Sequence, residues 1–390
     1  MVKLKALPNA PDQALNNVGW NWMLGTDTVP YVVNDLVVVS NEQASAYYDA
    51  ANTLYEMFVE AGQYAIDHLL FKELGIPENL VELVKLSWED DAQIHLYGRF
   101  DLAGGFDGEP VKLIEFNADT ATCVPETAVV QWAHLRMNGL DEARQFNTLY
   151  ETLVGQFQYL KEANETLNAS ILFSTMRGYP EDDTNVALLT AAAQEAGFDT
   201  EFAFVDDVEF SDGSGIFYQD SETGEFIKFD FWFKLVPWEY IGNDEPELAA
   251  MLTEIVKTRK AVVLNPAYTL LFQSKYILKV LWDLYPYHPL LLQTERYALS
   301  HKQSVSKVLF GREGANVSII AKGGEVLDSA EGEYGDQPKI YQEYTNFPVD
   351  EAGKSYQAGV FYAGEACALG FRRGGKILDN TAQFVGHIVE

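Results

Sequence analysis

The segment from Tyr97 to Thr122 constrains the fold of this 390-residue chain more than any other segment. Two short runs at 99–101 and 112–117, in which apolar and polar residues alternate, flank the sequence Gly-Gly-Phe-Asp-Gly at 104–108. Alternation with a period of two predicts strands, and a break rich in glycine and aspartate predicts a turn. The segment therefore predicts a β-hairpin in the first third of the chain.

One face of this hairpin carries polar groups. Because alternate residues of a strand share a face, Arg99 and Asp101 point one way, while Glu115 and Asn117 share a face of the other strand. A turn centred near residue 107 pairs odd-numbered residues with odd-numbered residues, which makes Asp101 and Glu115 diagonal neighbours. Two carboxylates and a carboxamide suit Mg²⁺, which also takes waters and phosphate oxygens. A solvated outer face of an ordinary hairpin fits the same spacing, so both interpretations stay open.

Helical and strand patterns alternate along the rest of the chain, which indicates a mixed α/β or α+β fold. Ser40 to Gln43 has the pattern of a capping box, and the apolar spacing after it predicts a long helix to about residue 69. The run 169–206 has the pattern of strand, helix and strand, one βαβ step of a parallel sheet. Further helices are predicted at 126–137, 147–161, 245–257 and 273–284, a hairpin at 215–234 with its turn at 221–224, and strands at 261–264, 306–310, 317–321, 339–344, 357–362 and 365–372.

The chain is strongly acidic, and its charge is unevenly distributed. It carries 27 Lys and Arg against 58 Asp and Glu, a formal net charge of −31, which argues against nucleic acid or an anionic membrane as a partner. Residues 1–260 hold 15 basic and 44 acidic side chains, whereas residues 261–390 hold 12 and 14, so the last third tolerates a polyanion such as ATP better.

The sequence shows no sign of a membrane segment or a secretory leader. No apolar run has the length needed to cross a bilayer, and the first residues lack an apolar signal region. The two cysteines make a disulfide framework improbable as a basis for the fold. We therefore expect a cytoplasmic protein.

The last third also contains polar side chains suited to phosphate. The loop 311–316, Gly-Arg-Glu-Gly-Ala-Asn, lies between two predicted strands, where its backbone N–H groups and Arg312 could fold over phosphates. The further candidates for such a site are Lys275, Lys307, Gln342 and Arg372. Each has an ordinary alternative, namely a plain hairpin turn, a solvated lysine, a capping amide or a surface ion pair.

Taken together, these segments resemble a known family. The chain is similar, in order and over nearly its whole length, to the synthetase domain of glutathionylspermidine synthase, an ATP-grasp ligase, and to its stand-alone bacterial homologues of the acid–amine ligase type. The motifs that carry the resemblance are Arg-Phe-Asp at 99–101, Ile-Glu-Phe-Asn-Ala-Asp-Thr at 114–120, Val-Val-Gln-Trp at 129–132, Phe-Lys-Leu-Val-Pro-Trp-Glu at 233–239, Gln-Ser-Lys-Tyr-Ile-Leu at 273–278, the run 281–289, Arg-Glu-Gly-Ala-Asn-Val at 312–317, Tyr-Gln at 341–342, Gly-Phe-Arg at 370–372 and Asp-Asn-Thr-Ala-Gln-Phe-Val at 379–385.

The resemblance implies an ATP-grasp fold joined to a preATP-grasp-like α/β domain. Residues 1–260 would form that domain together with the substrate and metal region, which includes the metal hairpin 97–120 and the α/β unit 169–206. Residues 261–390 would form the nucleotide-binding region, with 311–316 as its lid loop.

The resemblance also implies an activity, in which ATP phosphorylates a carboxylate and an amine then attacks the acyl phosphate to give an amide. Arg99, Arg312 and Arg372 would be catalytic. Asp101, Glu115 and Asn117 would hold two Mg²⁺ ions. ATP would lie against Lys275, Lys307, Gln342, Ile377 and Asp379. The acid would lie near Thr120 and Glu239.

The expected partners are a small-molecule or peptide carboxylic acid and an amine. The sequence departs from the expected family pattern at residues 121–125 and at Leu235, both near the expected acid site, so glutathione is the part of the implied reaction that is most in question. A nucleotide-binding regulatory protein without ligase turnover is the alternative interpretation, and a kinase-like enzyme that releases a phosphorylated acid is a third.

Overall fold

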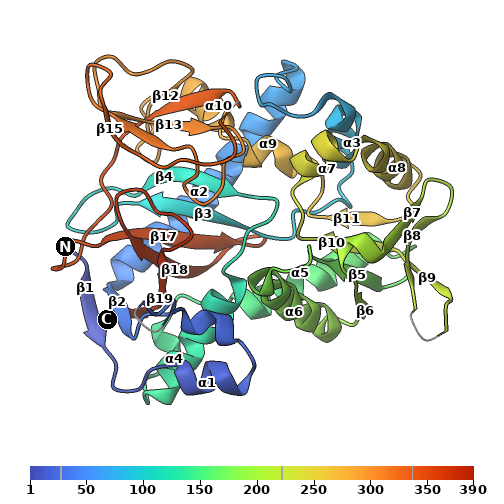
Figure 1. Cartoon of the computed structure of the whole chain (residues 1–390), viewed down its shortest axis with the longest axis horizontal. Helices are drawn as coiled ribbons and strands as arrows, with labels where there is room; N and C mark the ends of the chain where they lie inside the picture. The colour runs from blue at the N-terminus through green and yellow to red at the C-terminus, as the bar shows by residue number, and fades with distance from the viewer. Residues whose placement is uncertain (27–28, 221–222, 336) are drawn as a thin grey trace.

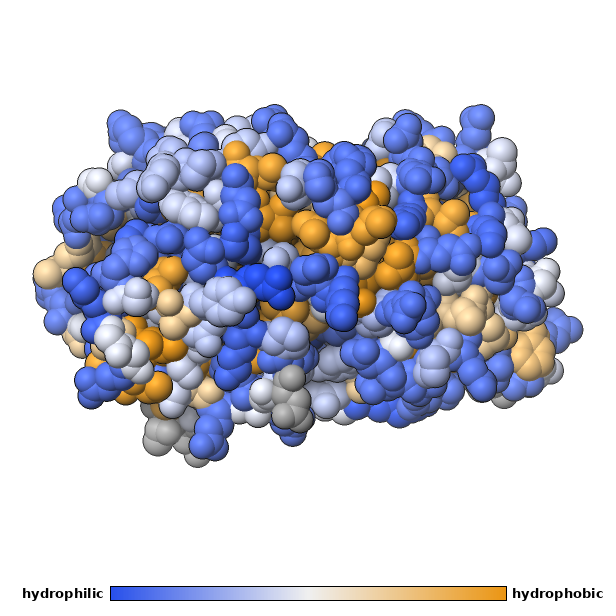
Figure 2. Space-filling view, turned by 90° about the horizontal axis from the view of Figure 1, so that it is seen from above, coloured by the Kyte–Doolittle hydropathy of each residue, from blue (hydrophilic) through white to orange (hydrophobic). Residues whose placement is uncertain are grey.

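A computed structural model of the chain describes residues 1–26, 29–220, 223–335 and 337–390. It contains an antiparallel five-stranded sheet at the centre of one half of the molecule and a parallel four-stranded sheet in the other half (Figure 1). A second antiparallel five-stranded sheet lies above the first in that view, and two three-stranded sheets complete the architecture. The upper face is mostly hydrophilic, as the acidic composition leads one to expect, with hydrophobic residues gathered in a band near its middle (Figure 2).

The central sheet has the order β19-β18-β17-β3-β4, and every neighbouring pair is antiparallel. Its strands are β3 (Gly98–Ala103), β4 (Lys112–Asn117), β17 (Ser355–Tyr362), β18 (Ala366–Gly374) and β19 (Gln383–Val385). The predicted hairpin 97–120 is therefore present, and the strands of the last third extend it into a sheet.

The long helix α2 (Asn41–Asp67) covers one face of this sheet, and the capping box predicted for it is confirmed. The Ser40 hydroxyl accepts from the Gln43 N–H, and the Gln43 side chain accepts from the Ser40 N–H. These bonds satisfy two of the donors that a helix start leaves open. Phe58 of the helix packs against the stacked rings of Phe100 and Phe116 on the hairpin, and this contact fixes the helix on the sheet.

The parallel sheet has the order β11-β10-β5-β6, with helices on both faces (Figure 1). The predicted βαβ step at 169–206 is confirmed, because β5 (Ser170–Ser174) and β6 (Asp199–Phe202) pair in parallel and α6 (Pro180–Glu195) connects them. The other elements of this half are β10 (Phe231–Lys234), β11 (Val262–Leu264), α3 (Val81–Glu89), α5 (Leu149–Ala163), α7 (Trp238–Asp244) and α8 (Pro246–Lys257).

The second five-stranded sheet has the order β12-β16-β13-β14-β15. Its strands are β12 (Thr294–Glu295), β13 (Ser304–Val308), β14 (Ser318–Ile320), β15 (Val326–Ser329) and β16 (Lys339–Glu343). The loop 311–316 joins β13 to β14, so it projects from the ends of these two strands.

Smaller elements complete the chain. The three-stranded sheets are β1-β2-β20 (Lys3–Ala6, Asp35–Val39, His387–Val389) and β7-β8-β9 (Val208–Ser211, Gly215–Gln219, Phe226–Phe229). The predicted hairpin at 215–234 is present as β8 and β9, while residues 221–222 of its turn lie outside the described residues. The remaining α-helices are α1 (Asp12–Asn17), α4 (Gln131–Met137), α9 (Thr269–Gln273) and α10 (Ile277–Leu284). Within the described ranges, no helix has the length and apolar character needed to span a membrane.

Two local predictions are corrected. Asp101 and Glu115 are direct cross-strand partners rather than diagonal neighbours, because a register shift after Asp101 changes the pairing that a regular hairpin would have. The helix predicted at 273–284 begins later, as α10 at Ile277, since Ser274 is extended and separates it from α9, which ends at Gln273. Lys275 lies in this break. The proposed division of the chain at residue 260 stays a prediction; the central and parallel sheets both contain strands from either side of it.

Candidate active site

Two adjoining cavities lie between the central sheet, the β13–β14 loop and the parallel half. The smaller cavity, of about 770 Å³, lies against the second five-stranded sheet, and the larger, of about 1960 Å³, opens toward α6 and α7. Residues common to both walls are Glu115, Gly314, Ala315, Gln357 and Leu378. A molecule that fills the smaller cavity therefore reaches the larger one beside Glu115.

The polar face of the hairpin lines the larger cavity. Arg99, which is 8% exposed, donates to both carboxylate oxygens of Asp101 at 2.7 and 3.1 Å and to the Thr122 carbonyl at 2.7 Å. The Asn117 side-chain amide donates to Asp101 at 3.1 Å. Burial alone would lower the pKa of Arg99, but the Asp101 carboxylate more than offsets this and raises it, so the guanidinium is charged. The predicted grouping of these side chains on one face is observed.

Two lysines meet Glu115 from the opposite side. The Lys275 ammonium lies 3.2 Å from a Glu115 oxygen and donates to the Gly311 carbonyl at 2.7 Å. Lys307 donates to the Gln342 side-chain oxygen at 2.8 Å, and the Gln342 amide donates to the Leu113 carbonyl. Lys275, Lys307 and Gln342 are each at least 94% buried, and all three line the smaller cavity.

The pKa values of this group reflect burial and mutual charge. Burial, with a smaller contribution from Lys275, lowers the pKa of Lys307 to about 8, although Glu115 opposes the shift. Burial alone would raise the pKa of Glu115, yet the two ammonium groups lower it overall. At the junction of the two cavities, the Glu115 carboxylate therefore partly neutralises the two ammonium groups of Lys275 and Lys307.

Two further arginines line the larger cavity. Arg312, on the β13–β14 loop, forms an ion pair with Glu239 at 2.5 Å, and its Nη2 is buried without a hydrogen-bond partner. Arg372, on β18, donates to the Asp379 carbonyl at 2.9 Å, and its Nε is likewise unpartnered. Buried donors without partners are costly unless a ligand satisfies them, so both arginines indicate an anionic ligand in this cavity.

The loop 311–316 makes a close backbone approach that requires glycine. Gly314 has φ +69°, and a Cβ at this position would lie 2.5 Å from the Leu378 carbonyl oxygen and 3.1 Å from Ile377. The loop therefore packs directly on the segment that contains Ile377, which lines the smaller cavity, and Asp379, which lines the larger one.

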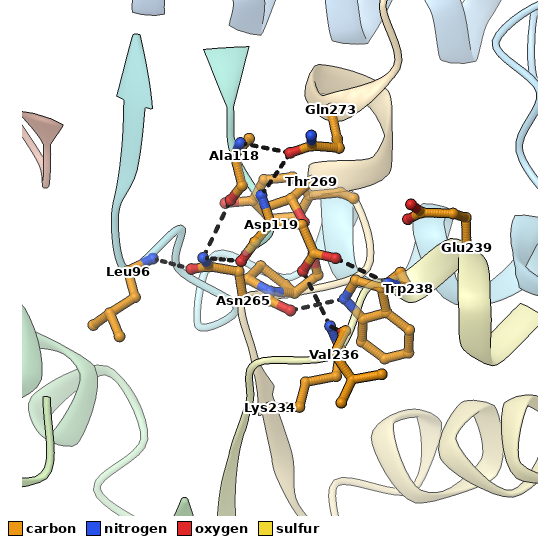
Figure 3. Close-up of polar contacts among 12 residues, drawn as sticks. Leu96, Ala118, Asp119, Lys234, Val236, Trp238, Glu239, Asn265, Thr269 and Gln273 are labelled. Atoms are coloured by element: carbon orange, nitrogen blue, oxygen red, sulfur yellow. Dashed lines mark hydrogen bonds and ion pairs between the residues drawn. The ribbon is translucent and has the colours of Figure 1, made fainter. Parts of the chain in front are cut away.

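A buried polar network holds the end of β4 in place (Figure 3). Asp119, fully buried, accepts from the Lys234 ammonium at 3.0 Å and from the Trp238 N–H at 2.9 Å. The Asn265 side chain donates to the carbonyls of Ala118 and Asp119, while Gln273 accepts from the N–H groups of the same two residues. Burial lowers the pKa of Lys234 and raises that of Asp119, and their mutual attraction opposes both shifts. This network fixes the loop that places Thr120 and Thr122 on the cavity wall.

Of the two residues expected at the acid site, only Thr120 lies on the cavity wall. Thr120 lines the larger cavity, but Glu239 is 2% exposed and is not part of the wall of either of these two cavities. It lies behind Arg312 instead of facing the open space. The departure at Leu235 does lie in the wall of the larger cavity.

Sequence reasoning missed an acidic part of this wall. Glu181 and Asp182, in the first turn of α6, line the larger cavity together with Glu313 of the loop. Burial and these like-charged neighbours raise the pKa of Asp182 to about 7. The only sequence signal was the Glu-Asp-Asp run after Pro180, which is also the ordinary composition of a helix start.

The oxygen donors of the hairpin fit a magnesium ion. Asp101, Glu115 and Asn117 offer two carboxylates and a carboxamide on one wall, a set that leaves room for waters and phosphate oxygens. No group of three or more His, Cys, Asp or Glu side chains suited to a metal occurs among the residues that the structure describes. A metal bound by this chain would therefore depend on ligands from a substrate as well.

Comparison with known proteins identifies the family that the chain resembles. The sequence model of the family described as "Glutathionylspermidine synthase preATP-grasp" matches residues 3–390. A Haemophilus influenzae protein named "Putative acid--amine ligase" is 29% identical over 99% of both chains. The "Bifunctional glutathionylspermidine synthetase/amidase" of Escherichia coli is 26% identical over 81% of this chain, which spans 52% of that protein. Trypanothione synthetase of Crithidia fasciculata is 25% identical over 74% of this chain and 46% of its own length.

The structural comparison concerns the fold alone. A glutathione synthetase-like effector from Globodera pallida superposes with a TM-score of 0.55, at 11% sequence identity, over 99% of this chain and all of that one. Together with the family match, this confirms the predicted mixed α and β fold of ATP-grasp type. The relatives are named as an acid–amine ligase and as synthetases, and with the family match they confirm the predicted class of ligase. The chain belongs to the glutathionylspermidine synthase family of amide-forming ligases.

Proposed function

We propose that this protein is an ATP- and Mg²⁺-dependent acid–amine ligase that joins a carboxylic acid to an amine through an acyl phosphate. The observation that carries the proposal is the junction at Glu115, where a cavity lined by two buried lysines and Gln342 opens into one lined by three arginines. A nucleotide in the first cavity would direct its terminal phosphate to the second, where the acid would lie.

The residues have distinct roles in the proposed reaction. Lys275, Lys307 and Gln342 would bind the nucleotide, with Ile377 and Asp379 on the adjoining segment. An acid oxygen attacks the γ-phosphorus while the bond to the β-phosphate bridging oxygen breaks, which gives an acyl phosphate and ADP. Arg99, Arg312 and Arg372 would stabilise the negative charge on the transferred group, because fixed donors in a site that excludes water act strongly on developing charge.

The second step forms the amide. The amine nitrogen attacks the acyl carbon, inorganic phosphate leaves with the bonding electrons, and the nitrogen loses a proton. The acidic wall formed by Glu181, Asp182 and Glu313 favours a cationic amine, which it would concentrate by charge attraction. Asp101, Glu115 and Asn117 would hold Mg²⁺, two ions by the family resemblance, and the metal would neutralise phosphate charge.

The acid lies, in this proposal, against Thr120. Glutathione and spermidine occur in the names of relatives; for this chain we propose only a small-molecule or peptide acid and an amine.

The test is ADP release with pooled acids and amines in the presence of ATP and Mg²⁺, followed by mass spectrometry of the product. Hydroxylamine in place of the amine should trap the activated acid as a hydroxamate, which separates activation from amide formation. Nucleotide binding without a hydroxamate or an amide, across a broad acid panel, would favour a regulatory nucleotide-binding protein. Absence of nucleotide binding by calorimetry at millimolar ATP would refute the proposed function.

A further inference from the structure

The β13–β14 loop is tied to a second segment of the same sheet. The Asn316 side chain donates to the Gly332 carbonyl at 3.0 Å and accepts from the Tyr334 N–H at 2.8 Å. Residues 311–316 and 330–335, here called the lid, therefore form one unit beside the larger cavity. Both parts contribute residues to its wall.

Helix α7 makes three contacts with this lid. Glu239 forms the 2.5 Å ion pair with Arg312, the Arg312 guanidinium lies 5.4 Å from the Tyr240 ring centroid, and the Tyr240 and Tyr334 hydroxyls are 2.8 Å apart. The contacts involve consecutive residues of α7 and both parts of the lid. They hold the lid against the parallel half of the molecule.

The position of Glu239 is itself fixed from the core. Trp238, the preceding residue, is fully buried, and it donates through its N–H to Asp119 and through its indole nitrogen to the Asn265 carbonyl at 2.9 Å. Figure 3 shows Glu239 directly after this anchored tryptophan. A buried carboxylate on a rigid support can set the position of a charged side chain on a neighbouring loop.

The Glu239 carboxylate stabilises the charged form of the Arg312 guanidinium. Burial alone would lower the pKa of Arg312, and Glu239 more than offsets it and raises the pKa, so the ion pair keeps the guanidinium charged away from bulk water. Glu239 engages Nη1 and leaves Nη2 of Arg312 buried and unpartnered. No aligned hydrogen bond reaches either Glu239 oxygen, so the pair acts through charge and proximity.

We propose that Glu239 is a positioning residue: it holds Arg312 over the larger cavity, and the Tyr240–Tyr334 contact keeps the lid closed around it. Glu239 does not touch the substrate; Arg312 does. This inference rests on the proposed function for its catalytic consequence, whereas the closure of the lid is a property of the free protein.

The first experiment needs no turnover. Hydrogen exchange of the amides of residues 311–316 is measured in the full chain without ligands, for the wild type and for Glu239→Gln, Glu239→Asp and Asp244→Asn. Asp244 is exposed on the same helix and serves as the matched control. We expect faster exchange in Glu239→Gln, partial recovery in Glu239→Asp and no change in the control. Equal exchange in the wild type and Glu239→Gln would overturn the inference.

The second experiment asks whether Glu239 acts through Arg312. Glu239→Gln should lower kcat by about 10- to 100-fold, since small displacements of a catalytic group cost this much, with little change in KM for ATP. In an Arg312→Gln background the same change should have almost no further effect, because the group that it positions is gone. Additive losses would show that Glu239 acts on another group and would refute the proposal. Absence of turnover in the wild type would count against the proposed function, while the exchange experiment still decides the lid contact.

Discussion

The buried pair of Lys234 and Asp119 provides the sharpest test of the energetics. Both side chains are completely buried, 3.0 Å apart, and Lys234 also donates to the Val236 carbonyl at 2.8 Å. Replacing lysine by methionine keeps most of the volume and leaves Asp119 as a buried carboxylate with one remaining partner, the Trp238 N–H. We predict a large loss of stability from this single change.

The magnitude follows from two limits. Removing one partner of a buried ion pair typically costs about 3–5 kcal/mol. The carboxyl group can instead take up a proton, and since pH 7 lies about 3 units above the ordinary aspartate pKa, protonation caps the cost at about 4 kcal/mol. We therefore expect Lys234→Met to lower the free energy of unfolding at pH 7 by about 3–4 kcal/mol.

Protonation of Asp119 also makes the loss of stability depend on pH. In the variant, the pKa of Asp119 in the folded protein is raised above its unfolded value, so the folded state binds more protons between those two values. Burial already raises the pKa of Asp119 in the wild type, and loss of Lys234 raises it further, so the stability of the variant falls relative to the wild type as the pH rises between these two folded-state pKa values, by up to about 1.4 kcal/mol per unit. The loss is smallest in mild acid and largest at neutral pH.

Urea unfolding followed by tryptophan fluorescence at pH 5 and pH 7 measures both quantities. Lys257→Met is the control, because Lys257 forms an exposed pair with Glu82 and its loss should change the unfolding midpoint far less. Lys234→Met with Asp119→Asn removes both charges and should be more stable than Lys234→Met alone. A loss below about 1 kcal/mol at pH 7, or one of equal size at both pH values, would refute the reasoning.

Three further outcomes test the site. Glu115→Gln should reduce ADP release at least about 100-fold while the protein stays folded by circular dichroism, because a charged ligand of the proposed metal is lost; unchanged turnover would show the metal assignment to be wrong. Because the pKa of Lys307 is lowered to about 8, nucleotide affinity measured by calorimetry should fall as the pH rises from 7 to 9, and Lys307→Gln should flatten this profile. The same lowered pKa also affects stability. Between pH 8 and 10.5 the unfolded chain binds more protons at Lys307 than the folded protein, so this group adds stability as the pH rises through that range. With the pKa of Asp182 at about 7, KM for a cationic amine should fall as the pH rises from 6 to 8, and persistence of that fall in Asp182→Asn would exclude this carboxyl as its cause.

Local sequence signals sufficed where a short-range rule decides the structure. The capping box at Ser40, the βαβ step at 169–206 and the hairpin at 97–120 all depend on residues close together in the chain, and all three are present. The errors arose where one residue changes a regular pattern. The register shift after Asp101 and the extended Ser274 break an alternation or a helix that the neighbouring residues support.

Contacts between distant segments had no sequence signal of their own. Lys234 has the pattern of an ordinary strand lysine, and its partner Asp119 is 115 residues away. Glu239 has the pattern of a polar residue at a helix start, whereas its position behind Arg312 depends on the packing of Trp238. These roles follow from which elements the fold brings together, and family motifs mark the residues without revealing what each one contacts.

The pairing of charges in the site has a consequence for how ligands bind. Arg99 and Lys275 each have a carboxylate partner, so in the free protein these two cations are already neutralised. A nucleotide alone would have to separate these pairs, at an electrostatic cost. A divalent cation on Asp101 and Glu115 would take over their carboxylates and leave the arginine and the lysine free for phosphate oxygens. If the protein binds ATP and Mg²⁺ as proposed, metal and nucleotide would be coupled through the same ion pairs, and each should strengthen the binding of the other by the same factor.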